Sequence, residues 1–160
     1  MMVVKISWTL YGDMLKELTT KIKKSGVKYD YILAIMRSGY PVGLYLSNHL
    51  KIPLLGIQVQ NHRYNEPERG ETKQELTVGE IYSGTDCFLL LKEFNILIVD
   101  EIMDTGESMK AVLEKVKKYT NNIYTAVLML ADDCKPEPTF YVDYVPECMW
   151  VVFPYEPNRD

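Results

Sequence analysis

An apolar run that ends in two adjacent carboxylates constrains the fold of this chain more than any other feature. Residues 96–99 read Ile-Leu-Ile-Val, and Asp100 and Glu101 follow them directly. A continuous apolar run of this length predicts a strand that is buried on both faces, as in a parallel sheet covered by helices. The two acids would then lie at the carboxyl end of that strand, which is where open α/β sheets bind their ligands.

The turn after these acids predicts a phosphate site. Residues 104–108 read DTGES and open a helix, whose first turn offers backbone N–H groups and the positive end of the helix dipole to an anion. Asp100 and Glu101 would repel a phosphate unless sugar hydroxyls or a divalent cation separate them from it. The stretch therefore predicts a phosphorylated sugar as ligand and Mg²⁺ as cofactor.

The sequence VDEIMDTGESM resembles the 5-phosphoribosyl-1-pyrophosphate (PRPP) binding motif of type I phosphoribosyltransferases, which has two acids, two apolar residues and then Asp-Thr-Gly-x-Ser/Thr. An acidic helix cap after a buried strand is the structural alternative, but the complete motif is far more specific than two acids and one glycine. The resemblance implies that Asp100 and Glu101 hold the ribose hydroxyls and that catalytic Asp104 accepts or relays a proton near N7 of the base. The 5′-phosphate cradle would be Thr105, Gly106, Glu107 and Ser108.

An earlier strand-to-helix turn carries a second candidate anion site. In the sequence AIMRSGYP, the guanidinium of Arg37 can grip two phosphate oxygens, and Gly39 lets the backbone approach a ligand closely. The turn resembles the pyrophosphate loop of the same family. That resemblance implies that Arg37, Ser38 and Gly39 bind the pyrophosphate leaving group, with a non-proline cis bond at Arg37-Ser38.

The order of apolar periods predicts one α/β domain over residues 1–160. The fold class expected from the resemblance is a Rossmann-like phosphoribosyltransferase core with a parallel sheet, a leading helix and a small C-terminal hood over about 136–160. The expected helices cover 8–22, capped by Ser7, then 41–50 and 106–119, and the expected strands cover 29–36, 53–60, 87–92, the motif strand at 96–99 and 123–130.

Two further segments are assigned through the resemblance. The polar stretch 61–85 is predicted to be a flexible loop that closes over the reacting centre, with Tyr64 and with Arg63 in place of the usual serine, both assigned to catalysis. The aromatic C-terminus resembles a purine-binding hood, in which Trp150 stacks on the base and Val151 offers backbone groups to its edge. Glu156 joins Asp100 and Glu101 as a predicted magnesium ligand.

The choice of base depends on the end of the strand at 123–130. The 6-oxopurine enzymes have a lysine there, whereas this chain has Ala131, followed by Asp132 and Asp133, with Lys135 beyond. Because carboxylates accept hydrogen bonds and adenine presents an amino donor, we expect adenine, with Asp132 as a base-binding residue. A solvated acidic turn is the structural alternative for the two aspartates.

The expected function is purine salvage, in which adenine and PRPP give AMP, a nucleoside monophosphate, and pyrophosphate. The alternatives are the same reaction on hypoxanthine, guanine or xanthine, and a PRPP- or nucleotide-sensing regulator without catalysis. We expect a homo-oligomer, either a dimer or a tetramer. The formal net charge of −4 argues against a nucleic-acid surface, and three cysteines without a CxxC pair fit neither a disulfide framework nor a zinc site. With neither a signal peptide nor a membrane span, the expected localisation is cytoplasmic.

Overall fold

The computed structural model describes residues 2–66, 71–82, 93–132, 134–146 and 149–156, with the backbone alone at 61–66 and 71–75. A six-stranded sheet in the order β4-β3-β2-β5-β6-β7 forms its centre, and β1 and β8 form a separate two-stranded sheet. The elements are β1 (Met2–Lys5), α1 (Trp8–Lys24), β2 (Tyr31–Met36), α2 (Gly39–Leu50), β3 (Leu54–Glu66), β4 (Glu71–Tyr82), β5 (Ile96–Met103), α3 (Glu107–Val116), β6 (Ile123–Ala131), β7 (Asp143–Val145) and β8 (Met149–Val152).

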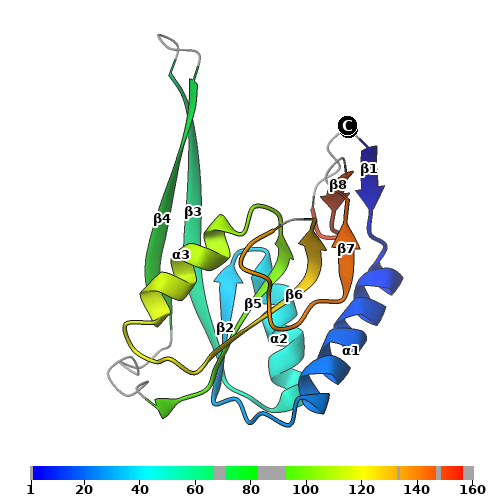
Figure 1. The fold of residues 1–160 in the computed structure, drawn as a ribbon. Coiled ribbons are helices and arrows are strands. Elements are labelled where there is room, and N and C mark those ends of the chain that lie inside the picture. The colour runs from blue at the N-terminus through cyan, green and yellow to red at the C-terminus, as the bar shows by residue number, and fades with distance from the viewer. Residues whose placement is uncertain (1, 67–70, 83–92, 133, 147–148, 157–160) are drawn as a thin grey trace.

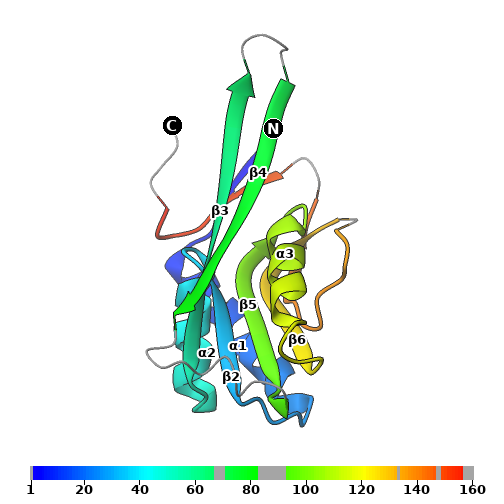
Figure 2. The same cartoon turned by 90° about the vertical axis from the view of Figure 1, so that its left-hand side faces the viewer.

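Helices cover both faces of the central sheet, with α1 and α2 on one side and α3 on the other (Figure 2). Alternate residues of β2 divide between these layers: Ile32 and Ala34 pack in the cluster that contains α1 and α2, while Leu33 and Ile35 pack with α3. Residues 96–99 of β5 are fully buried. The strand buried on both faces, and the α/β class, are therefore confirmed.

The sheet changes its direction of winding between β2 and β5. The chain passes from β2 through α2 to β3 on one side, and from β5 through α3 to β6 on the other, with all of these strand pairs parallel. Parallel sheets bind ligands at the carboxyl end of such a switch point. In Figure 1 this edge lies at the top, between the β3–β4 hairpin and the small β1–β8 sheet.

The leading helix follows the prediction closely. The Ser7 side chain caps α1 by accepting a hydrogen bond from the backbone N–H of Leu10 at 3.1 Å, and the last turn carries Lys21, Lys23 and Lys24. No helix in the described part of the chain is long and apolar enough to cross a membrane.

The segment 61–85 differs from the expected loop. Its residues 61–66 and 71–82 continue β3 and β4 as an antiparallel hairpin, in which Gln60 pairs with Thr77 and Glu66 pairs with Glu71. The described part of the hairpin projects beyond the core (Figure 1), where a strand needs no apolar period facing a helix. The strand expected at 87–92 lies outside the described residues.

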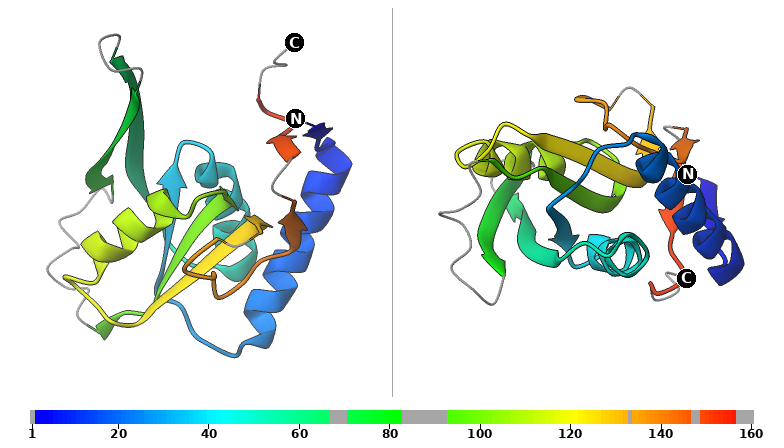
Figure 3. Two further views of the ribbon diagram at one scale, coloured as in Figure 1. Left: turned by 45° about the horizontal axis from the view of Figure 1, so that its top comes forward. Right: turned by 90° about the horizontal axis from the view of Figure 1, so that it is seen from below.

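The C-terminal segment forms a hood together with β1 at the start of the chain. The part that β1 plays in the hood was not predicted from the sequence. Strand β7 extends the central sheet beside β6, whereas β8 pairs in parallel with β1, with Val4 opposite Val151. Figure 3 shows this small sheet beyond the N-terminal end of α1. Strand β1 has only four residues, too few to show a periodic pattern, and its partner β8 lies more than a hundred residues further along the chain.

Candidate active site

Two buried carboxylates stand at the carboxyl end of β5. Asp100 is 8% exposed and Glu101 is 6% exposed, and the backbone N–H of Glu101 donates to Asp100 Oδ1 at 2.8 Å. Burial raises the pKa of Asp100 to about 7, and burial together with the Asp100 charge raises the pKa of Glu101 to about 8. Within the described residues Glu101 Oε2 has no hydrogen-bond partner. The pair is therefore short of donors or of positive charge, which a ligand would supply.

The turn after β2 packs directly against this pair. A Cβ atom on Gly39 would lie 2.9 Å from Asp100 Cα and 2.9 Å from the Val99 carbonyl oxygen, so only glycine allows the approach. Ser38 hydrogen-bonds to Glu101, which offsets part of the rise in its pKa. Arg37 is exposed at the same turn, and the cis bond is Met36-Arg37, one position before the predicted one.

The turn at residues 104–108 leads from β5 into α3. Gly106 caps α3 with φ of 76°, and a Cβ atom there would lie 2.8 Å from the Lys135 carbonyl oxygen. The backbone N–H of Glu107 lies 3.4 Å from Thr105 Oγ1, while Asp104, Thr105 and Glu107 are exposed and Ser108 is half-buried. The turn thus places an open helix N-terminus beside the acidic pair.

A cavity of about 300 Å³ lies between this edge of the sheet and the hood. It is called the base cavity, after the purine base that is predicted to bind there. Glu101 and Asp104 line it from the sheet side, and Trp150, Val151 and Glu156 line it from the hood. The structure therefore brings together the predicted catalytic acid, one acid of the pair and both hood residues that were assigned to the base.

The predicted base-binding Asp132 is not among the residues that line the base cavity. Ala131 does line it, but Asp132 is exposed and lines a neighbouring cavity together with Lys135. The strand ends at Ala131, and the backbone N–H of Asp132 donates to the Val145 carbonyl oxygen at 3.2 Å, which continues the pairing of β6 with β7 to this point. Asp133 lies outside the described residues.

Glu156 stabilises the turn that follows β8 in the hood. Its Oε2 atom accepts a hydrogen bond from the backbone N–H of Phe153 at 2.9 Å. Across the described ranges, no three His, Cys, Asp or Glu side chains are grouped to hold a metal, so the predicted set of Asp100, Glu101 and Glu156 is not assembled as one. Mg²⁺ usually takes one or two carboxylates plus substrate phosphates, and the acidic pair at β5 fits that pattern.

The two predicted loop residues lie in the hairpin. Arg63 pairs with Gln74 and Tyr64 with Lys73 in the β3–β4 ladder, but their side chains lie outside the described part of the structure. Their catalytic roles stay predictions.

Three aromatic residues that pack beside the site, Tyr11, Phe153 and Tyr155, were not identified from the sequence. The Tyr155 hydroxyl donates to the Ser38 carbonyl oxygen at 3.3 Å, and the Tyr155 ring stacks on Phe153 with centroids 5.9 Å apart. Tyr11 of α1 packs edge-on against both rings. The contacts of Tyr155 with Ser38 and with Tyr11 link the hood to the turn after β2 and to α1, and no spacing in the sequence signals them because these partners lie far apart in the chain.

Comparison with known proteins agrees with this geometry. The profile of the phosphoribosyl transferase domain family matches residues 7–160. A hypoxanthine/guanine phosphoribosyltransferase of Methanocella paludicola is 31% identical over 109 residues, which are 66% of this chain and 54% of the relative. The human phosphoribosyltransferase domain-containing protein 1 is 26% identical over 82% of this chain and 60% of its own length. The chain thus spans between half and two thirds of these curated relatives.

Solved structures show the same fold. The purine phosphoribosyltransferase of Pyrococcus horikoshii superposes with a TM-score of 0.80 at 30% identity, covering 100% of this chain and 98% of that one. The xanthine-guanine-hypoxanthine phosphoribosyltransferase of Helicobacter pylori has a TM-score of 0.72 at 23% identity, covering 94% of this chain and 91% of that one.

Proposed function

Because the chain belongs to the phosphoribosyl transferase domain family, we propose that it transfers the 5-phosphoribosyl group of PRPP to a purine base. The observation that carries this proposal is the buried pair of Asp100 and Glu101, which lies between the two turns predicted to bind anions and of which Glu101 lines a cavity that contains Trp150 and Phe153. The products would be a purine nucleoside 5′-monophosphate and pyrophosphate.

The proposed binding mode follows from charge and hydrogen bonding. The ribose hydroxyls donate to the two carboxylates, which supplies donors to Glu101 Oε2 and lowers the pKa of the acids. The 5′-phosphate takes the N-terminus of α3, and the pyrophosphate takes the turn of Arg37 and Gly39. Mg²⁺ would be held by the acidic pair together with pyrophosphate oxygens, and it would neutralise charge on the leaving group.

The transfer forms a bond from the base nitrogen N9 to ribose C1′ and breaks the bond from C1′ to a pyrophosphate oxygen. The base loses a proton in this step, and Asp104, which lines the base cavity, accepts or relays it. Arg37 stabilises the charge that develops on the leaving pyrophosphate. Trp150 stacks on the purine and excludes water from it.

We propose a 6-oxopurine, hypoxanthine or guanine, as the preferred base. The names of the relatives support this choice, and Asp132 is not among the described residues that line the base cavity. Adenine stays the second candidate, because Ala131 lines the cavity where a lysine would donate to O6. The edge of β8 that faces away from β1 offers backbone groups of both polarities and can serve either base.

Initial rates with PRPP, Mg²⁺ and each of adenine, hypoxanthine, guanine, xanthine and uracil test the proposal. We expect the highest kcat/KM with hypoxanthine or guanine and none with uracil. In the variant Ala131→Lys the ratio of 6-oxopurine to adenine use should rise, because a new donor faces O6. A clear preference of the wild type for adenine would establish the second candidate, and no reaction with any purine would refute phosphoribosyl transfer.

A further inference from the structure

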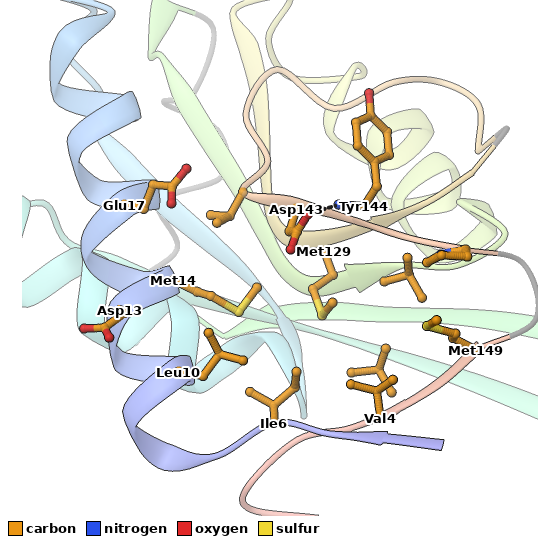
Figure 4. Close-up of a pocket in the computed structure, with 14 residues that line it drawn as sticks. Val4, Ile6, Leu10, Asp13, Met14, Glu17, Met129, Asp143, Tyr144 and Met149 are labelled. Atoms are coloured by element: carbon orange, nitrogen blue, oxygen red, sulfur yellow. Dashed lines mark hydrogen bonds between the residues drawn. The ribbon is translucent and has the colours of Figure 1, made fainter. Parts of the chain in front are cut away.

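A second cavity lies behind the hood, between α1, β1 and the strands β6 to β8. It is called the rear cavity, and its volume of about 490 Å³ exceeds that of the base cavity. Three methionines, Met14 of α1, Met129 of β6 and Met149 of β8, line it together with branched aliphatic side chains such as Ile6 (Figure 4). Its size is in the range of small-molecule sites, which are mostly apolar.

The rear cavity and the base cavity share a wall. Val145, Pro146, Met149 and Val151 line both of them. A change in the position of these residues therefore alters both cavities at once, and Met149 has a flexible side chain that can adapt to either occupant.

We propose that the rear cavity binds a small aromatic amine and that its occupancy changes the affinity of the base cavity for its purine. The binding half of the inference stands on the rear cavity alone. The coupling half rests on the proposed function of the base cavity.

The apolar lining selects the aromatic body of the ligand. Thioether sulfurs make favourable contacts with aromatic rings, and three flexible methionines adapt to a flat group without a fixed shape. Leu10, on the open side of the cavity, is 47% exposed, which leaves a large apolar side chain for the ligand to cover.

The charges around the rear cavity select an amine over an acid. Asp13, Glu17 and Asp143 line it and are exposed, whereas no Lys or Arg is among the described residues that line it. Asp13 pairs with Lys16 and Glu17 with Lys21, both as exposed pairs on one helix, which are weak. Asp143 has no salt-bridge partner in the part of the chain that the structure describes, so it can meet a ligand ammonium group directly.

Isothermal titration of the purified protein with 4-phenylbutylamine tests the binding half, with 4-phenylbutyrate and 4-phenylbutanol as charge-reversed and neutral probes. We expect the amine to bind with a Kd of roughly 1 mM or tighter and the acid to bind at least tenfold more weakly. Equal affinity for amine and acid, or no binding of the amine, would overturn the proposal.

Tryptophan variants of two leucines with similar exposure test whether the amine binds in the rear cavity. Leu10→Trp places a bulky ring into the rear cavity, whereas Leu44→Trp makes the same change on α2, away from the cavity, at a residue of similar exposure, 48%. Amine binding should fall at least fivefold in the first variant and stay unchanged in the second. Equal loss in both variants, or in neither, would place the amine elsewhere.

Two matched charge variants test the role of the carboxylate. Asp143→Asn should weaken amine binding several-fold and leave the neutral alcohol unchanged, while Glu114→Gln on α3 serves as the control. A loss that is the same for amine and alcohol would show that charge plays no part.

The coupling half is measured as the KM for the purine with and without saturating 4-phenylbutylamine. A change of about fivefold or more is expected, and the Leu10→Trp variant should abolish it. Amine binding with an unchanged KM would refute the coupling alone. An enzyme that makes no nucleotide would refute the proposed function and leave the titration result standing, so the two failures are distinguishable.

Discussion

Gly39 lies so close to β5 that no larger residue fits at this position without a movement of the backbone. In the variant Gly39→Ala the new methyl group would meet Asp100 Cα, Asp100 Oδ1 and the Val99 carbonyl oxygen, each at 2.9 Å. Two of these atoms are backbone atoms of β5, buried in the centre of the sheet, so they cannot rotate away. Either α2 or the end of β5 must move.

The expected cost follows from overpacking in a rigid site. Inserting a methyl group into a well-packed core destabilises by about 1–3 kcal/mol, which lowers the Tm of a chain this long by roughly 2–12 °C. Any movement also shifts Asp100 relative to the turn at Arg37. We therefore expect PRPP binding to weaken by more than the loss of stability alone would explain.

Gly12 provides the matched control. It lies within α1, and a Cβ atom there would have no neighbour within 4 Å. Gly12→Ala should therefore stabilise the protein by about 0.5–1 kcal/mol through helix propensity. Urea unfolding of both variants and titration of each with PRPP and Mg²⁺ make the comparison. A Gly39→Ala protein as stable as the wild type, with unchanged PRPP affinity, would show that the turn does not press on Asp100.

Three further predictions concern single side chains. Asp104→Asn should lower kcat by roughly 10²-fold and leave nucleotide affinity within a few-fold, which single-turnover kinetics and titration separate. The folded pKa of Glu101, about 8, lies above its ordinary 4.5, so the folded protein keeps a proton that the unfolded chain loses. Without ligands the Tm should therefore fall as the pH rises from 5 to 8. In Glu101→Gln this fall should be smaller. A Tm that rises with pH in both proteins would contradict the raised pKa of Glu101. The buried Tyr11 hydroxyl has no hydrogen-bond partner in the described structure, so Tyr11→Phe should leave the Tm unchanged or raise it. Tyr29→Phe should lower the Tm, because it loses a hydrogen bond to Ser25 Oγ at 3.2 Å.

The parts of the fold that could be predicted are those with strong local signals. The apolar run before Asp100 fixes a buried strand, Ser7 caps α1, and the Gly-containing turns open α2 and α3. The sequence therefore predicted that the two strand-to-helix turns and the acidic pair lie at one edge of the sheet, because the carboxyl ends of adjacent parallel strands meet there.

The parts that could not be predicted depend on distant partners. The outer hairpin projects beyond the core, and its polar sequence resembles that of a loop. Strand β1 pairs with β8, which lies at the other end of the chain. Asp132 lines a neighbouring cavity, and a strand pattern does not show which cavity the residue after Ala131 will face. Its role in binding the base stays a prediction.

The central claim is that this site joins a purine to the ribose of PRPP. The most direct test incubates the protein with PRPP, Mg²⁺ and an equimolar mixture of purines, and identifies the products by mass spectrometry. We predict one or more purine nucleoside 5′-monophosphates, formed in an amount equal to the pyrophosphate released and reduced about 10²-fold by Asp104→Asn. Release of pyrophosphate with only ribose 5-phosphate as its partner product, or no product from any purine, would contradict it.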